Sequence, residues 1–482
     1  MDEKKSELRN MKKSKKLKQR FFSAFLILNS AFLLLFAGCA VGPDYKRPPV
    51  NEPPHFRGDA GVKTNSFGDM PWWELFRDDA LQGLIRTALT NNYDIRIAVT
   101  RMEQANALLA ESRAAYYPQL NYSGAVGRGK NAELGNAFPG VRQNQWYEAI
   151  GNVSWEIDLW GRLRRLKESV KAQYLATTEA RNDVTISLIS TLASDYFQLL
   201  ALDRELQIAR DTTNSFGESL KIFSERLKGG VASKLETSAA EAQEASAAAT
   251  IPELQRQIFA RENQISILLG TNPGPIIRGE KLLDEVLPPN VPPGLPSSLL
   301  ERRPDIRESG QLVRSANAQI GVAKANFYPK FSLTGLFGQV SPEASAFTSG
   351  GANAWSAAAD VAGPIFQGGL LKGELHETQA AWKETVLQYQ ATILNALQEV
   401  SNALEARRRF EEERVEQARA VTAYEEAVRV ANERYRSGHA NYYELLQEQQ
   451  LLFPAENALT QAELNQLLAN VQLYQALGGG WK

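Results

Sequence analysis

Four stretches of the chain alternate apolar with polar residues, at about 117–128, 146–159, 329–340 and 354–366. In the second stretch the odd positions from Tyr147 to Leu159 are apolar or glycine, and most even positions are polar. A period of two is typical of a β-strand with one apolar face. Strands of ten or more residues are long for a soluble sheet but suit a tilted membrane strand. A soluble sandwich with one buried face is the alternative interpretation.

Aromatic residues near the strand ends favour the membrane. They have the distribution of an interfacial belt and comprise Tyr116, Tyr117, Trp160, Phe327, Tyr328 and Phe366. The loops inside the two predicted hairpins, about 129–145 and 341–352, are longer than tight turns. Because longer loops usually face the outside in outer-membrane barrels, we expect these two loops at the extracellular end.

Two other stretches predict very long helices, at 162–228 and 370–436. Neither contains proline, and each contains a single glycine, Gly217 or Gly373. At 1.5 Å per residue, ~65 residues span roughly 100 Å, far beyond a globular domain. Each is followed by a shorter helix, about 232–269 and 441–477, rich in Ala, Gln, Glu and Leu. The pattern predicts two antiparallel, coiled-coil-like hairpins, although an ordinary long hairpin with a solvated charged face would look similar.

The chain repeats itself at an offset of about 210 residues, as Tyr117-Pro118 and Tyr328-Pro329 illustrate. Each copy contains a helix, two strands and two long helices in the same order, so we expect tandem repeats. The predicted organisation comprises an extended N-terminal segment at 39–85, repeat 1 at 86–270, a Pro-rich linker at 271–303 and repeat 2 at 304–478.

Composition argues against chemistry at an active site. The formal net charge is -1, and the basic residues concentrate at the N-terminus, which leaves a mildly acidic body and no electrostatic case for nucleic-acid binding. A single cysteine excludes an intramolecular disulfide framework and a Cys-based zinc site. The three histidines lie far apart, and we find no nucleophile–base motif, phosphate-binding loop or metal cluster. We therefore predict no catalytic residues, no cofactor and no metal.

The N-terminus is typical of a secretory signal peptide spanning residues 1–38. A basic segment precedes the apolar run 21–37, and small residues follow. The cysteine, Cys39, comes next, which resembles a bacterial lipobox and implies lipidation of Cys39 at the mature N-terminus. In that resemblance Ala40 implies sorting to the outer membrane, and Phe36 departs from the usual Leu. An uncleaved anchor or a core cysteine is the alternative interpretation, and translation starts at either Met1 or Met11.

Four strands cannot close a barrel, since about eight is the practical minimum. Open strand edges in lipid leave unpaired backbone groups, each costing several kcal/mol. The chain is therefore expected to oligomerise and pool its strands. Long helices attached to such a ring would form a tube reaching into the periplasm.

The sequence resembles the outer membrane factors, the TolC-like exit ducts, in their NodT-like lipoprotein branch. The resemblance covers 39–482 and is carried by these motifs: the run from Cys39 through Val41-Gly42-Pro43-Asp44-Tyr45 to Pro48, then Trp72-Trp73, Arg302-Arg303-Pro304-Asp305-Ile306 and Tyr328-Pro329. It implies a mixed α/β membrane protein: a homotrimer with a 12-stranded β-barrel, four strands per chain, continuous with a periplasmic α-helical coiled-coil tunnel.

The resemblance also implies a function. The chain would be the outer-membrane exit duct of a tripartite efflux system, working with a periplasmic adaptor protein, an inner-membrane RND-type pump and outer-membrane lipid. Two alternatives stay open, an exit duct for type I protein secretion and a non-conducting lipoprotein that spans the envelope. The substrates are not predicted.

Two helix turns are the candidate adaptor-docking sites, with plain turn chemistry as the alternative. Glycine in each permits a tight reversal. The residues of the first turn are Arg226, Leu227, Gly230, Val231 and Ser233, and those of the second are Arg434, Tyr435, Gly438, His439 and Asn441.

The candidate gate follows the second turn. Where the resemblance places a charged clamp, this chain has Gln447 and Gln450. Glu444 and Glu448 nearby would form an acidic ring, and such rings select cations. Alternatively, Tyr442 and Tyr443 would form an apolar constriction, and a solvated helix face remains a further interpretation of these residues.

Overall fold

The computed structural model describes residues 40–51, 53–57, 66–130, 143–279, 281–282, 285, 294, 296–348 and 350–480. The predicted signal peptide, Cys39 and part of the Pro-rich linker lie outside these residues. The chain divides into two compact units. The described part of unit 1 lies within 40–48, 104–175 and 311–387, and that of unit 2 lies within 49–103, 176–310 and 388–480.

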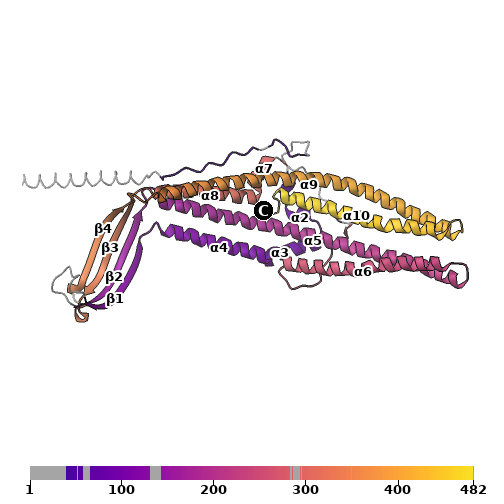
Figure 1. The fold of residues 1–482 in the computed structure, drawn as a ribbon, viewed down its shortest axis with the longest axis horizontal. Coiled ribbons are helices and arrows are strands. Elements are labelled where there is room, and N and C mark those ends of the chain that lie inside the picture. Colours follow the sequence, from indigo (N-terminus) through magenta and orange to yellow (C-terminus); the bar gives the residue numbers. More distant parts are fainter. Residues whose placement is uncertain are drawn as a thin grey trace, which may run out of the picture. The chain divides into compact units, whose positions relative to one another are not determined.

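Unit 1 contains a four-stranded antiparallel sheet in the order β1-β2-β3-β4 (Figure 1). Its strands are β1 Gln119–Lys130, β2 Gln143–Ile157, β3 Lys330–Ser341 and β4 Asn353–Ala362. Strand β2 begins three residues earlier than expected from the alternation. Strand β4 ends four residues earlier, because Pro364 lacks the N–H that a ladder needs and ends the strand together with Gly363.

The register gives the sheet one apolar and one polar face. Tyr122 lies opposite Gly151, Gly151 opposite Phe337, and Phe337 opposite Trp355. Residues directly opposite share a face. The apolar face is exposed in the single chain: Tyr122 is 94% and Trp355 81% accessible. This sheet therefore needs an apolar environment outside its own chain.

The helices of the two halves have equal lengths. Each half contains one helix of 22 residues, one of 67 and one of 35. The first half has α4 Tyr93–Ala114, α5 Arg162–Lys228 and α6 Lys234–Leu268, and the second has α8 Pro304–Ala325, α9 Leu370–Arg436 and α10 Tyr442–Ala476. Among the described residues, only α5 has a window apolar enough to cross a membrane, and 67% of that window is buried, as in a core helix.

The segment 39–85 is not extended throughout, contrary to the prediction. It contains the 3-10 helix η1 Phe67–Asp69, the short helix α2 Trp72–Leu75 and the first residues of α3 Asp79–Asn91. Helix α3 starts there because the Asp78 carboxylate accepts a hydrogen bond from Leu81 N at 2.9 Å. The predicted linker likewise contains a helix, α7 Pro296–Arg302. Two single-turn 3-10 helices, η4 Ala344–Ala346 and η5 Gly350–Ala352, lie between β3 and β4.

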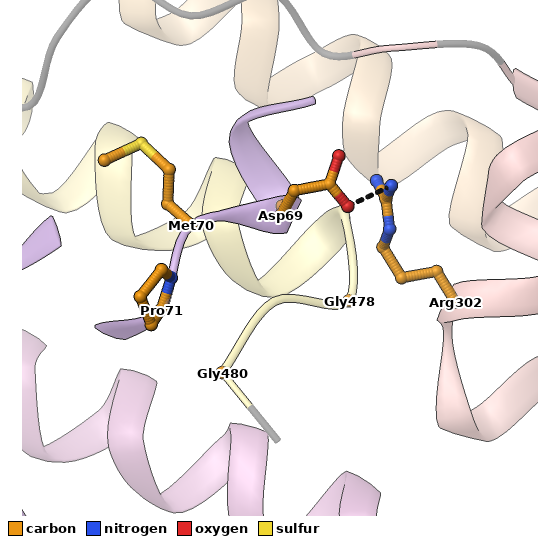
Figure 2. A pocket seen from close by; sticks show the side chains of 7 residues that line it. Asp69, Met70, Pro71, Arg302, Gly478 and Gly480 are labelled. Atoms are coloured by element: carbon orange, nitrogen blue, oxygen red, sulfur yellow. Dashed lines mark hydrogen bonds and ion pairs between the residues drawn. The ribbon is translucent and has the colours of Figure 1, made fainter. Parts of the chain in front are cut away.

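An aromatic cluster joins this N-terminal segment to α10 within unit 2. Tyr474 packs edge-on against Phe67 and Phe76, and its hydroxyl donates to Met70 O at 2.6 Å. Beside it, Arg302 donates to Asp69 at 2.6 Å across a cavity of about 120 Å³ bordered by Gly478 and Gly480 (Figure 2). The segment is thus held to the end of α10 and to α7.

Candidate functional site

The two predicted docking turns close with the same backbone geometry. Val231 N donates to Arg226 O at 2.9 Å, and His439 N donates to Arg434 O at 2.8 Å. Gly230 and Gly438 take φ values of 75° and 77°, which only glycine adopts without strain. Both turns therefore end their long helix with a Schellman motif.

Polar side chains then start the returning helices. Ser233 accepts a hydrogen bond from Glu236 N and forms a capping box, and Asn441 accepts one from Glu444 N. Helices α6 and α10 consequently begin at Lys234 and Tyr442, slightly later than predicted. The imidazole of His439 lies 3.0 Å from Ser437 Oγ in the exposed turn.

The structure brings the two turns together through Arg226 and Tyr435. The Arg226 guanidinium donates to the Tyr435 hydroxyl, and its centre lies 5.0 Å from the Tyr435 ring centroid. The residues are 209 positions apart and belong to different hairpins. We call this pair the tip latch.

An apolar cluster lies behind the tip latch. Tyr442 is 3% exposed and packs against Phe223 with ring centroids 4.0 Å apart. The other members fill the space between the hairpins: Phe216, Ala240, Ala247 and Leu446, with Leu220, Ala232 and Tyr435 at the margin. Burial raises the pKa of Tyr442 and of Tyr435, so both hydroxyls stay neutral at physiological pH.

The predicted gate residues therefore differ in their surroundings. Tyr442 faces the neighbouring hairpin, whereas Tyr443, Gln447 and Gln450 are exposed at helical spacing on one face of α10. Glu444 pairs with Arg434 at 2.8 Å, and Glu448 is partly exposed.

Sequence reasoning missed Phe216 and Phe223. Their spacing of seven residues places both on one face of α5, and this apolar pair so close to a predicted turn was the available signal. The partnership of Arg226 with Tyr435 has no such signal, because it depends on how two hairpins cross.

A buried charge cluster surrounds Arg303 in unit 2. Its guanidinium donates to Asp305 at 2.7 Å, to Glu399 at 2.6 Å and to Ala476 O at 2.9 Å. Burial, reinforced by nearby carboxylates, raises the pKa of Asp183 and of Glu308. One arginine thus sits among several partly desolvated acids and links α8, α9 and the end of α10.

The N-terminal segment 40–48 is bound to α5 and α8 within unit 1. Val41 N donates to Trp160 O at 2.9 Å, Arg165 donates to Asp44 at 2.8 Å, and Asn317 donates to Pro43 O at 3.0 Å. At Gly42 (φ 107°) a Cβ would lie 2.5 Å from the Cα of a second glycine on α8, so the segment lies directly on the helix backbone. These contacts account for the Val-Gly-Pro-Asp run.

Replacing Arg165 with Met is expected to loosen this segment. The change removes the charged bond to Asp44, and such bonds are worth enough to shift a local equilibrium about tenfold. We expect trypsin to cut after Lys46 about tenfold faster than in the unaltered protein, measured by mass spectrometry of timed digests. Lys372→Met, on an exposed site of α9, is the control, and equal cutting rates in both variants would contradict the assigned role.

The described residues contain no group of three His, Cys, Asp or Glu side chains that could hold a metal ion. Cys39 itself lies outside the described part of the chain.

Comparison with known proteins shows which family this chain resembles. Residues 84–271 and 295–479 match the family model described as outer membrane efflux protein. The chain is 34% identical over 94% of both chains to the probable efflux pump outer membrane protein TtgC of Pseudomonas putida. It is 30% identical over 94% of its length, and 98% of its relative's, to the probable outer membrane lipoprotein SilC of Salmonella typhimurium.

Solved structures agree with these sequence relatives. The open-state MtrE outer membrane channel of Neisseria gonorrhoeae superposes with a TM-score of 0.84 and 28% identity, covering 92% of this chain and 99% of MtrE. The family match spans both halves, and the two sequence relatives extend over nearly the whole chain. The chain therefore belongs to the outer membrane efflux protein family.

Proposed function

We propose that three copies of this outer-membrane efflux protein close a 12-stranded barrel and continue it as a helical periplasmic tunnel. The chain is the outer-membrane exit duct of an efflux system. The observation that carries the trimer is the sheet of unit 1, whose apolar face is exposed and whose outer strands, β1 and β4, each have one neighbour within the described chain. Because unpaired edges are costly in lipid, β4 of one copy pairs with β1 of the next. The polar face then lines the lumen.

The equal helix lengths of the two halves support a tandem duplication. So does the match of one family model to two successive ranges. Each copy of the duplicated unit supplies two strands and one long helical hairpin. The proposed trimer would then contain six quasi-equivalent strand pairs and six quasi-equivalent helical hairpins.

In this proposal the two helix turns around Gly230 and Gly438 and the start of α10 are responsible for docking and gating. The two exposed turns contact the periplasmic adaptor, which connects the duct to an inner-membrane RND-type pump. The exposed stripe of Tyr443, Gln447 and Gln450 forms the constriction, and the tip latch holds it closed. Glu444 is neutralised by Arg434, so Glu448 is the acid that remains for an acidic ring. Lipid on Cys39 anchors the bound segment 40–48 in the outer membrane.

Single-channel recording tests this function. The purified protein should run as a heat-modifiable trimer and give discrete, cation-preferring steps in planar bilayers. Glu448→Gln should lower the cation preference about twofold or more, because a ring of three charges is lost. Glu426→Gln, on the exposed side of α9, is the matched control. A monomer without steps, even after the tip latch is removed, would favour the non-conducting lipoprotein.

An experiment in cells distinguishes a function in small-molecule efflux from one in protein secretion. Deletion of the gene should raise drug susceptibility without loss of any secreted protein from the medium. The relative TtgC supports the first outcome, since it carries an efflux-pump name.

A further inference from the structure

One tryptophan, Trp146, lies on the polar face of the sheet, although the other strand aromatics lie on the apolar face. Trp146 of β2 shares the polar face with Asn152, Ser154 and Glu156, because all occupy even positions of that strand. The other strand aromatics lie on the apolar face, and they are Tyr122, Tyr147, Trp155, Phe331, Phe337 and Trp355. Among the strand residues that the structure describes, Trp146 is the only aromatic side chain on the polar face.

The indole lies against two glycines of the neighbouring strand. Trp146 is directly opposite Gly127, where a Cβ would overlap the six-membered ring, and the ring reaches to 3.9 Å from the Cβ position of Gly129. Trp146 nevertheless remains 42% exposed. One side of the indole is thus held by β1 and the other is open.

Covering a glycine does not by itself explain this choice. Phe337 covers Gly151 in the same way, but it does so on the apolar face, where an aromatic ring is favourable anyway. Elsewhere this face combines polar pairs such as Asn121 with Asn152 with aliphatic side chains, namely Ile150, Leu336 and Val340, but with no other aromatic ring among the described strand residues. An exposed indole held in one orientation on a water-facing wall is a stacking surface.

A carboxylate lies beside this surface. Glu148 is two residues further along β2, hence about 7 Å away on the same face. It lies opposite Ala125, is partly exposed, and forms no ion pair with any residue in the described part of the chain. The pair combines a π face with a negative charge, and that is the chemistry that recognises organic cations.

We propose that Trp146 and Glu148 bind flat, monovalent organic cations on the lumen wall near the extracellular end of the barrel. The inference rests on the proposed function, in which the polar face lines the lumen and the trimer carries three such sites. Binding is weak, about millimolar, because a site on an exit path has to release what it binds. The site favours cationic aromatic cargo over neutral aromatic cargo at the last stage of export.

Two probes of the same shape test the charge requirement. N-methylquinolinium is a flat cation, and quinoline is its neutral counterpart at pH 8. Saturation-transfer NMR titrations of the purified full-length protein should give a dissociation constant at least about fivefold lower for the cation. Equal affinity for the two probes would overturn the proposal in favour of apolar adsorption.

Variants then locate the site. Trp146→Ser and Glu148→Gln should each weaken cation binding at least about fivefold, and Trp146→Phe should retain part of it. Asp360→Asn is the control, because Asp360 is a carboxylate on the same face at the opposite end of the sheet. Unchanged binding in the first two variants, or an equal loss in Asp360→Asn, would refute the assignment.

The oligomeric state of each sample separates this inference from the proposed function. If the protein is a conducting trimer and the variants bind like the unaltered chain, only the inference fails. If the protein is not a trimer but the cation preference and the variant losses persist, the site stands and the barrel proposal fails. Should Trp146→Ser not assemble, Glu148→Gln alone decides, since it leaves the indole on its glycines.

Discussion

Removing the tip latch is expected to open the duct. In the double variant Arg226→Ala/Tyr435→Phe, each protomer loses one hydrogen bond and one cation–π contact between its hairpins. At this exposed site the pair contributes about 1 kcal/mol, hence about 3 kcal/mol for a trimer, which changes the open-to-closed ratio on the order of 100-fold. Planar-bilayer recordings should show a matching rise in open probability.

A matched variant separates the latch from a general loss of charge. Arg429→Ala removes an arginine that pairs with Glu426 and Glu433 on the exposed side of α9. It should leave the open probability unchanged. In cells, the latch variant alone should admit vancomycin, which is too large for ordinary porins. A latch variant as closed as the Arg429→Ala protein would show that the two hairpins are held by the apolar cluster around Tyr442 instead.

Replacing Arg303 with Met should produce the largest loss of stability. The side chain is 10% exposed and pairs with Asp305 and Glu399. The partners Asp305 and Glu399 keep 28% and 54% of their side-chain surface exposed, so the loss corresponds to the charged hydrogen bonds themselves, about 2–3 kcal/mol. The measurement is the temperature at which the trimer dissociates on gels and loses its helical circular dichroism. Arg409→Met, which removes exposed ion pairs on α9, should change that temperature little.

The loss should depend on pH. Burial raises the pKa of Asp183 and Glu308 above the values of the unfolded chain. Between those values the native chain binds more protons than the unfolded one, so these acids become less destabilising as the pH falls. Arg303 lowers the pKa of Asp183, so removing its positive charge enlarges the effect at Asp183, and the variant should recover part of its stability from pH 8 to pH 5. A deficit independent of pH would indicate that lost packing, not charge, causes it.

Local patterns predicted the strands and the long helices of this protein. Alternation around Val153 and Phe337 predicted the strands and their apolar face, and the absence of proline across α5 and α9 predicted helices of unusual length. Polar start signals were less reliable, since the cap at Asp78 and the short helices of the segment 39–85 were overlooked. The family resemblance followed from the run after Cys39 together with three further motifs, and the lipidation of Cys39 stays a prediction.

The partners of the functional side chains came only from the tertiary structure. The sequence alone determined strands, long helices and two reversals at Gly230 and Gly438, because each follows from the face or the flexibility of a local segment. It did not determine that Tyr442 is buried against Phe223, or that Arg226 meets Tyr435 209 positions away. Such contacts depend on how two hairpins cross and which side of each helix turns inward. Small differences in the packing of many side chains decide that geometry, and no local pattern encodes it.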